Sequence, residues 1–383
     1  MPEERLKPIQ LIHTPSEMAA AAGHLADQSI IAGDLEADSL FHFQERICLL
    51  QLAAPDTIYI IDPLALADMT PIKRIMEDRT IKKVFHGADY DVRSLYRDFR
   101  INFQNLFDTE LASRFLGYSE TGLNAIIKQA FHVELEKKFQ RKDWSQRPLP
   151  DEMVEYAADD VRYLIDLQAR LEAQLVEKGR LAWVMEECED IAAVRPAPME
   201  TRPLFTRCKG AGRLPPRSLA VLEALLEMRH QKARQKDRPP FKVIGTTALI
   251  DLAQRRPKSM NALRSLNILS SKQIDMHGKD ILQAIKTGNA VPADQLPAFP
   301  KHFRPKPSAE SMKKIRDLKK WRQREADKLA VDPGVFFSNA QIKAVVEAVP
   351  SGIGDLEAIN GLKKWQIREY GEKLIEMIRS PEG

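Results

Sequence analysis

A short apolar stretch near the N-terminus, residues 29–37, carries two acidic residues where a buried strand normally carries apolar ones. Ile30 to Ala37 is predicted to form a β-strand, and side chains alternate between the two faces of a strand. Asp34 and Glu36 therefore point to the same face. Two like charges this close are unfavourable unless a cation lies between them or one of them is protonated. The alternative interpretation is a strand that frays into an acidic surface turn.

The segments that follow predict a mixed sheet. Residues 30–37, 47–52 and 57–61 are β-rich and are joined by short connections, which is the pattern of an antiparallel meander. Beyond Pro71 the pattern changes to helices over 71–78 and 88–99 that alternate with strands over 81–85 and 105–107, and then to helices as far as about residue 190. The first domain is therefore predicted to be an α/β domain, with a mixed β-sheet flanked by helices.

The charge of the chain is unevenly distributed along its 383 residues. Residues 1–200 hold 23 Lys or Arg and 35 Asp or Glu, a net charge of −12, whereas residues 201–300 have a net charge of +11 and residues 301–383 of +5. An acidic part with clustered carboxylates beside a basic part suggests metal chemistry in one and polyanion binding in the other. Chance segregation of charge is the alternative.

Several features exclude other classes of protein. The sequence has no run of about 18 apolar residues, so no membrane span is expected. The first residues lack the pattern of an export signal, and the three cysteines are far apart without a CxxC pair. We therefore expect a cytoplasmic protein with neither a zinc site nor a disulfide framework.

The second half of the chain contains an internal repeat with a spacing of 93 residues. Apolar positions match apolar positions, and Pro257 and Gly278 match Pro350 and Gly371. We predict an all-α part made of two copies of one small helical domain. The predicted boundaries are residues 1–193 for the α/β domain, 194–216 for a Pro-rich linker, 217–290 for the first helical domain, 291–308 for a second linker and 309–383 for the second helical domain.

Two more places in the first domain combine acidic residues with an apolar stripe. In the helix over 88–99, Asp89 and Asp91 flank the apolar stripe almost symmetrically, and periodicity does not choose between them. In a helix predicted over residues 151–175, Asp160 falls within the apolar stripe, whereas Asp159 falls on the polar face. Tyr156 precedes Asp160 by one turn, so both side chains face the same space. A core Asp that pairs with Arg or His is the alternative.

The three motifs together resemble those of the ribonuclease D family, in the tyrosine-bearing branch of the DEDD exonucleases. The matching residues are Asp34-Leu35-Glu36, the stretch from His86 to Val92, and Tyr156-Ala157-Ala158-Asp159-Asp160. The segment Lys142 to Leu149 is similar to that family too, and the repeat resembles two copies of the helicase-and-RNase-D C-terminal (HRDC) domain, the first more closely than the second. The resemblance covers nearly the whole chain and implies an RNase H-like fold in the first domain.

The resemblance also implies roles for individual residues. Asp34, Glu36, Asp91 and Asp160 match the metal ligands, with Asp34 expected to bridge two ions, and Tyr156 matches the tyrosine that orients the attacking water. The family motif selects Asp91 over Asp89. The implied cofactors are two divalent ions, Mg²⁺ or Mn²⁺, which prefer oxygen ligands, and no small-molecule cofactor is expected. The expected activity is 3′-to-5′ exonucleolytic hydrolysis of RNA that releases nucleoside 5′-monophosphates, with tRNA precursors as substrates.

Basic residues supply the candidates for RNA contacts. Lys138 and Trp144 lie where basic and aromatic residues interleave before the Asp160 helix, and Arg229, Lys232 and Arg234 form part of a basic run in the first repeat. A solvated helix face and core packing of Trp144 are the alternatives. Two other functions stay open: a 3′-5′ exonuclease that acts on DNA, and a non-catalytic protein that binds nucleic acid.

Overall fold

The computed structural model describes residues 7–197, 202–300 and 307–379. Contacts divide the chain into two units: one contains residues 1–37, 47–196 and 305–383, and the other contains residues 38–46 and 197–304. Within the described residues, no helix combines the length and the apolar character that crossing a membrane requires.

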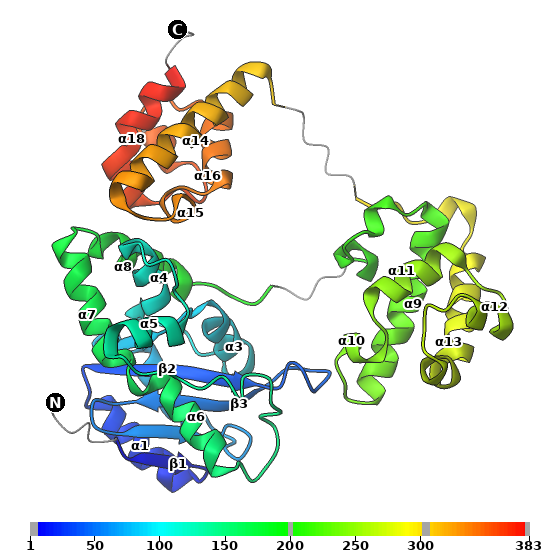
Figure 1. Cartoon of the computed structure of the whole chain (residues 1–383), viewed down its shortest axis with the longest axis horizontal. Helices are drawn as coiled ribbons and strands as arrows, with labels where there is room; N and C mark the ends of the chain where they lie inside the picture. Colours follow the sequence, from blue (N-terminus) through cyan, green and yellow to red (C-terminus); the bar gives the residue numbers. More distant parts are fainter. Residues whose placement is uncertain (1–6, 198–201, 301–306, 380–383) are drawn as a thin grey trace. The chain divides into compact units, whose positions relative to one another are not determined.

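The first unit is built on a six-stranded sheet in the order β1-β4-β3-β2-β5-β6 (Figure 1). Strands β2, β3 and β4 form the predicted antiparallel meander, and β5, β6 and β1 pair in parallel with their neighbours. The strands are β1 (Ile9–Ile12), β2 (Ile30–Ala37), β3 (Ile47–Ala53), β4 (Ile58–Ile61), β5 (Lys82–Phe85) and β6 (Leu106–Asp108). The mixed sheet was predicted, but the short strand β1 was not.

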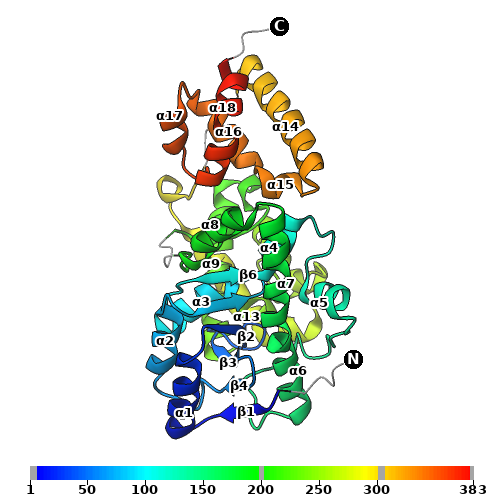
Figure 2. The ribbon, with the colours of Figure 1, turned by 90° about the vertical axis from the view of Figure 1, so that its left-hand side faces the viewer.

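Helices cover both faces of the sheet, so each face buries its own apolar core. Figure 2 shows α1, α2 and α3 on one side and α5, α6 and α7 on the other. The first group packs on the face that includes Ile31 and Leu35, and the second group faces Ala32 and Leu49. The helices are α1 (Pro15–Ala26), α2 (Thr70–Glu77), α3 (Asp89–Phe99), α4 (Thr109–Leu116), α5 (Leu123–Phe131), α6 (Asp151–Arg162), α7 (Leu164–Glu177) and α8 (Leu181–Ala192).

The single helix predicted over 151–175 is wrong, because the structure divides it at Tyr163 into α6 and α7. Helix α6 packs against β3 and β4, whereas α7 packs mainly against α4. The break at Tyr163 thus lets the two helices pack against different elements. Apolar periodicity runs through the break and gave no sign of it.

The two helical domains reproduce the 93-residue repeat element by element. Arg229 in the first repeat and Arg322 in the second show this in detail, because each donates to the backbone carbonyl fifteen residues later, of Ile244 and Phe337 respectively. The first repeat comprises α9 (Pro216–Gln235), α10 (Pro240–Val243), α11 (Thr246–Arg255), α12 (Met260–Ser265) and α13 (Ser271–Ala290). The second comprises α14 (Ala309–Leu329), α15 (Pro333–Phe336), α16 (Asn339–Ala348), α17 (Ile353–Glu357) and α18 (Lys364–Arg379).

Part of the predicted linker 194–216 belongs instead to the core of the first helical domain. The 3₁₀ turns η1 (Leu204–Arg207) and η2 (Ala211–Arg213) place Phe205 and Ala211 among the buried side chains of α9 and α11. The apolar residues of this segment are too sparse to show periodicity, but a domain this small gains from every buried aromatic ring. Residues 198–201 of this linker and 301–306 of the second predicted linker lie outside the described residues.

The second helical domain packs against the exonuclease-like part of its own unit. Trp365 at the start of α18 stacks on Trp183 of α8, with ring centroids 4.5 Å apart and an angle of 17° between the planes. Glu186 accepts hydrogen bonds from the backbone amides of Lys364 and Trp365, so a side chain of α8 caps α18. A Cβ at Gly117 would lie 1.7 Å from the carbonyl oxygen of Ala330, which shows how closely the two parts approach.

Candidate active site

Strand β2 brings Asp34 and Glu36 to the sheet face covered by α6 and α7. Asp34 lies opposite Gln51 of β3, and Glu36 lies opposite Leu49. Both acidic side chains remain partly exposed, so solvent reaches them. Gly33 precedes Asp34 and faces the opposite side of the sheet. A Cβ at Gly33 would lie 2.4 Å from the ring of Phe85, so glycine leaves the room that this ring needs.

In the first turn of α3, the structure shows which of Asp89 and Asp91 faces the candidate site, a choice that periodicity could not make. Asp91 is buried, with 6% of its surface exposed. Asp89 is exposed and binds Arg93 through two hydrogen bonds of 2.7 and 2.9 Å. The structure thus keeps Asp89 in a surface ion pair and turns Asp91 toward the sheet, where burial and then the charge of Asp34 raise its pKa.

Helix α6 supplies the last two members of the candidate set. The side chains of Asp160 and Tyr156 both interact electrostatically with Asp34. Asp159 points elsewhere, because its carboxylate accepts a hydrogen bond of 2.7 Å from the Arg162 guanidinium. The helix therefore directs one of its two adjacent aspartates toward β2 and the other toward a basic neighbour.

Tyr156 is held in place by the segment that precedes α6. Its ring lies against Phe139 and Trp144, with centroid distances of 5.7 and 6.0 Å, and the Gln140 side chain forms a hydrogen bond with its hydroxyl. Only 1% of Trp144 is exposed, so the predicted contact between Trp144 and RNA is wrong. The indole instead packs against Tyr156, because a large ring next to the sheet gains more from burial than from exposure at a strand end.

Burial raises the pKa of every carboxyl group in the candidate set, and the charges of neighbouring carboxylates raise those of Glu36, Asp91 and Asp160 further. Burial raises the pKa of Asp34 to about 7, and burial together with the charge of Asp34 raises that of Asp160 to about 8. The pKa of Glu36 rises to about 10 because of burial and then of the charges of Asp34, Asp160 and Asp91. The pKa of Asp91 lies well above its ordinary value because of burial and the charge of Asp34.

These four carboxyl groups form no ion pair with Lys, Arg or His within the described residues. Nor do three or more acidic, His or Cys side chains of the described chain already converge as the ligands of one ion. The charges of the four groups nevertheless act on one another, because those of their neighbours raise the pKa values of Glu36, Asp91 and Asp160. Four clustered oxygen donors without a basic partner fit hard divalent cations, which supply the missing positive charge.

Gln51 is a polar residue near this site that sequence reasoning missed. It is fully buried, lies directly across from Asp34, and neither its amide nitrogen nor its amide oxygen has a hydrogen-bond partner within the protein. Burying an amide without partners is costly. The signal in the sequence was a single polar residue in the apolar run Ile47 to Ala53, but its position beside Asp34 depends on strand register.

Asp108 at the end of β6 was also missed, and it fixes the position of α3. Its carboxylate accepts hydrogen bonds from the backbone amides of Gly87 and Ala88, at 3.0 and 2.8 Å. It also caps α4 by accepting from the amides of Glu110 and Leu111. One buried side chain therefore ties the turn before Asp91 to the start of the next helix.

The basic residues predicted to contact RNA differ in the hydrogen bonds and ion pairs that they form within the protein. Arg229 donates to the Ile244 carbonyl and to Thr246, both at 3.1 Å, so its assignment to RNA is replaced by an internal structural role. Lys138 and Lys232 form ion pairs with Glu152 and Asp280, at 2.6 and 2.9 Å. Arg234 is exposed.

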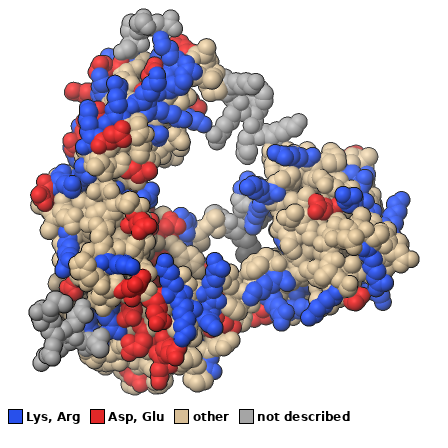
Figure 3. Space-filling model, viewed as in Figure 1, with Lys and Arg blue, Asp and Glu red and all other residues tan. Residues whose placement is uncertain are grey.

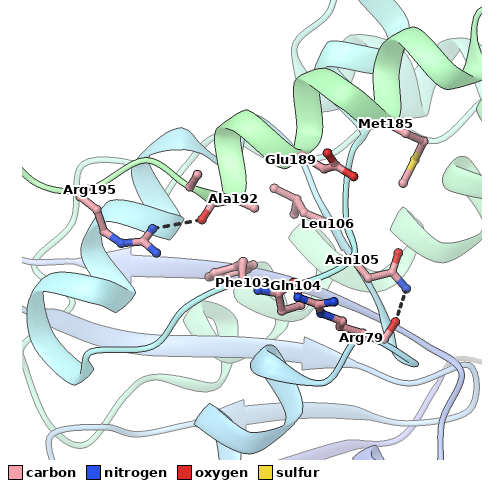
Figure 4. A pocket seen from close by; sticks show the side chains of 10 residues that line it. Arg79, Phe103, Gln104, Asn105, Leu106, Met185, Glu189, Ala192 and Arg195 are labelled. Atoms are coloured by element: carbon pink, nitrogen blue, oxygen red, sulfur yellow. Dashed lines mark hydrogen bonds between the residues drawn. The ribbon is translucent and has the colours of Figure 1, made fainter. Parts of the chain in front are cut away.

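A cavity of about 570 Å³ lies in the same unit but away from the acidic cluster (Figure 4). Its walls come from α8, the end of α2 and the segment before β6, and none of the candidate residues lines it. Part of its polar lining is already engaged, because Arg195 donates to the Ala192 carbonyl and Asn105 donates to the Arg79 carbonyl. This cavity is therefore separate from the candidate site.

Comparison with known proteins assigns the fold and this site to a class. Residues 9–176 match the family model of 3′-5′ exonucleases, and residues 218–285 and 312–378 each match that of the HRDC domain. The chain is therefore a 3′-5′ exonuclease domain followed by two HRDC domains.

Individual relatives and a solved structure indicate which family of 3′-5′ exonucleases this chain resembles. Ribonuclease D of Escherichia coli is 30% identical over 289 residues, which cover 75% of this chain and 77% of that one. Ribonuclease D of Pseudomonas paraeruginosa is 28% identical over 97% of this chain and 98% of its own. The crystal structure of E. coli RNase D superimposes with a TM-score of 0.73 at 26% identity and covers 98% of this chain and 100% of that one.

The chain belongs to the ribonuclease D family. It is a 3′-to-5′ exoribonuclease that acts on RNA, and enzymes of this family depend on divalent metal ions.

Proposed function

We propose that Asp34, Glu36, Asp91 and Asp160 hold two divalent ions, Mg²⁺ or Mn²⁺, at the end of the RNA strand. The observation that supports this most directly is the cluster of four carboxyl groups with raised pKa values and no basic partner. Bound divalent ions would supply a hydroxide nucleophile near neutral pH and stabilise charge on the leaving oxygen.

Tyr156 contributes a hydroxyl group whose proton is firmly held. Burial and the charges of Asp160, Glu36 and Asp34 raise its pKa. It therefore remains protonated at neutral pH and can act as a hydrogen-bond partner that orients the attacking water toward phosphorus. The rings of Phe139 and Trp144 restrict its movement, which keeps that hydroxyl in one position.

We further propose that the substrates are tRNA precursors and other RNAs with single-stranded 3′ ends. The E. coli enzyme is described as an exoribonuclease involved in structured RNA processing, and this chain is similar to it over its full length. Lys138, Lys232 and Arg234 are the proposed contacts with phosphate groups. A cytoplasmic location would agree with the three cysteines, none of which forms a disulfide bond within the described residues.

Digestion of labelled nucleic acid tests this function. RNA and DNA of the same sequence, labelled near the 5′ end, are incubated with the protein in Mg²⁺, in Mn²⁺ and in EDTA. We expect RNA to shorten one nucleotide at a time from the 3′ end, to release nucleoside 5′-monophosphates, and to stay intact in EDTA. Preference for DNA would favour a DNA exonuclease, and failure on both substrates would favour a non-catalytic binding protein.

Metal removal should make stability depend on pH in a defined direction. Without metal, the folded protein keeps protons on Asp34 and Asp160, with pKa values of about 7 and 8, which the unfolded chain releases near pH 4. The free energy of unfolding in EDTA should therefore fall as the pH rises from about 4 to about 8. Added Mn²⁺ should raise the melting temperature more at the higher pH, because ligation requires deprotonated carboxylates.

Thermal melts at several pH values, with EDTA or with Mn²⁺, measure this effect. The Glu152→Gln variant is the matched control, because Glu152 is an exposed carboxylate of the same helix as Asp160 and pairs with Lys138. It should show the same metal-dependent shift as the unmodified protein. A shift that is equal at both ends of the pH range would contradict the assignment of the four ligands.

A further inference from the structure

The cavity beside α8, away from the acidic cluster, has the size of a small-molecule site. Its volume of about 570 Å³ falls within the range of protein ligand pockets, about 300 to 1,000 Å³. Figure 4 shows Met185 and Glu189 on the α8 side of this space and Phe103 and Gln104 on the opposite side. We call it the α8 cavity, and its lining includes Arg79, Phe103, Gln104, Met185, Glu189 and Arg195.

The wall of the α8 cavity opposite α8 is held by contacts within the exonuclease domain. The Phe103 ring packs edge-on against Phe85, with ring centroids 5.2 Å apart. The backbone amide of Gln104 donates to the Met76 carbonyl at 3.1 Å. A ligand that enters such a preformed cavity orders few side chains, so little of its binding free energy is lost.

The α8 cavity contains two arginines that form no ion pair within the described residues. The Arg195 guanidinium donates to the carbonyls of Ala192 and Val194, at 3.1 and 2.7 Å. It also donates to the Asn102 amide oxygen at 2.6 Å, so all three acceptors are uncharged. Arg79 is exposed. Two cations without a carboxylate partner favour an anionic ligand, and guanidinium groups match the geometry of phosphate.

These two cations lie in a domain that is predominantly acidic. Residues 1–200 have a net charge of −12. Figure 3 shows Asp and Glu side chains gathered over α6 of the exonuclease domain. Such regions repel an anion, whereas the arginines of the α8 cavity attract it. The cavity is therefore a place in this domain where a free phosphate group is favoured.

The side of the α8 cavity formed by α8 offers a hydrogen-bond acceptor. Glu189 is exposed and forms no ion pair in the part of the chain that the structure describes. A carboxylate accepts hydrogen bonds through both oxygens. Guanine presents two adjacent donors to such a group, its N1–H and its exocyclic amine. The thioether of Met185 lies beside Glu189 and provides a polarizable apolar surface for a planar ring.

We propose that the α8 cavity binds a nucleoside 5′-monophosphate. Arg79 binds the phosphate, Arg195 adds positive charge, and Glu189 and Met185 contact the base. At neutral pH a phosphate monoester carries nearly two negative charges and accepts strong hydrogen bonds from guanidinium groups. Nucleoside 5′-monophosphates are also the expected product of the exonuclease, and this link rests on the proposed function. The released nucleotide thus has a second site outside the acidic cluster.

Titration calorimetry with GMP in EDTA tests the proposal. Without metal ions the carboxyl groups of the acidic cluster offer a phosphate no positive charge, so binding reports the α8 cavity. We expect GMP to bind saturably with a stoichiometry of one. Guanosine lacks the phosphate contact and inorganic phosphate lacks the base contacts, so each should bind about tenfold or more weakly.

Two variants and one control locate the binding. Arg79→Gln removes the phosphate contact, and Ala193→Trp fills the cavity from an exposed position of its lining. Each should weaken GMP binding by about tenfold or more. Both positions lie outside the acidic cluster, so the two variants should cleave RNA at the unmodified rate. Arg74→Gln, which removes an exposed cation from α2 outside the cavity, should bind GMP like the unmodified protein.

The outcomes separate this proposal from the proposed function. Absence of saturable GMP binding in EDTA would overturn the proposal, and so would equal affinities for Arg79→Gln, Ala193→Trp and Arg74→Gln. Inorganic phosphate that binds as tightly as GMP would show an anion site without base contacts and would also overturn it. If the unmodified protein binds GMP in the α8 cavity but degrades no RNA, the proposed function fails while the nucleotide site is supported.

Discussion

Replacing Asp34 by Asn is expected to abolish RNA cleavage while making the metal-free protein more stable. Asp34 interacts electrostatically with Glu36, Asp91 and Asp160, so it is the carboxylate that all other proposed ligands share. If the four carboxylates hold the metal ions, losing the one nearest to all the others should cost about a thousandfold or more in kcat, equivalent to roughly 4 kcal/mol of transition-state stabilisation. The same change removes a like charge from a buried cluster, so the melting temperature in EDTA should rise near neutral pH.

This combination distinguishes a catalytic ligand from a residue that supports the fold, because loss of a structural residue lowers activity and stability together. Single-turnover cleavage, thermal melts in EDTA, and RNA binding in EDTA are the three measurements. Asp89→Asn is the matched control: it removes an exposed carboxylate from α3 that pairs with Arg93, and should leave cleavage nearly unchanged. An Asp34→Asn variant that still cuts at the unmodified rate would refute the assigned site.

Most of the acidic cluster could be predicted from the sequence, because short-range patterns within single strands and helices indicate its members. Alternation along β2 placed Asp34 and Glu36 on one face, and the apolar stripe of α6 placed Asp160 apart from Asp159. Asp91 could not be chosen over Asp89 by periodicity, because both lie in the first turn of α3. Only the family motif made that choice before the structure showed one residue buried and the other exposed.

The features that the sequence did not reveal depend on contacts between distant segments. Gln51 is opposite Asp34 only because β3 pairs with β2 in one particular register, and a shift by one residue would have turned it to the other face. For Trp144 the sequence left an RNA contact and core packing both open, and only tertiary packing places it against Tyr156. The Pro-rich segment before α9 lacked periodicity, although Phe205 within it is buried.

The packing of the second HRDC domain against the exonuclease domain could not be predicted from the sequence, for the same reason. Trp183 and Trp365 each fit an ordinary amphipathic helix, and nothing in either segment indicates that they meet. In the structure, the apolar core that includes α4, α7 and α8 continues into α14, α16 and α18. The second repeat therefore extends the apolar core of the catalytic domain.

Replacing Trp365 by Ala should therefore destabilise more than the domain in which Trp365 lies. Trp365 is fully buried, contacts Trp183 and Phe115 across the interface, and donates from its indole nitrogen to Glu187 at 3.2 Å. Truncation of a buried Trp to Ala typically costs about 3 to 5 kcal/mol. We expect chemical denaturation to show a loss of this size for the second HRDC domain and a smaller loss for the exonuclease domain.

A double-mutant cycle with Trp183→Ala separates docking from the internal stability of the HRDC domain. If the two rings stabilise each other across the interface, the double variant should lose less than the sum of the two single losses, by about 0.5 to 1.5 kcal/mol for an aromatic pair. Asp355→Ala serves as the control, because the Asp355 carboxylate accepts hydrogen bonds of 2.7 and 2.6 Å from the amide and the hydroxyl of Ser351 within its own domain, and its loss should be additive with that of Trp183→Ala. Additivity of Trp183→Ala and Trp365→Ala would mean that the stacked rings do not hold the second repeat against the exonuclease domain.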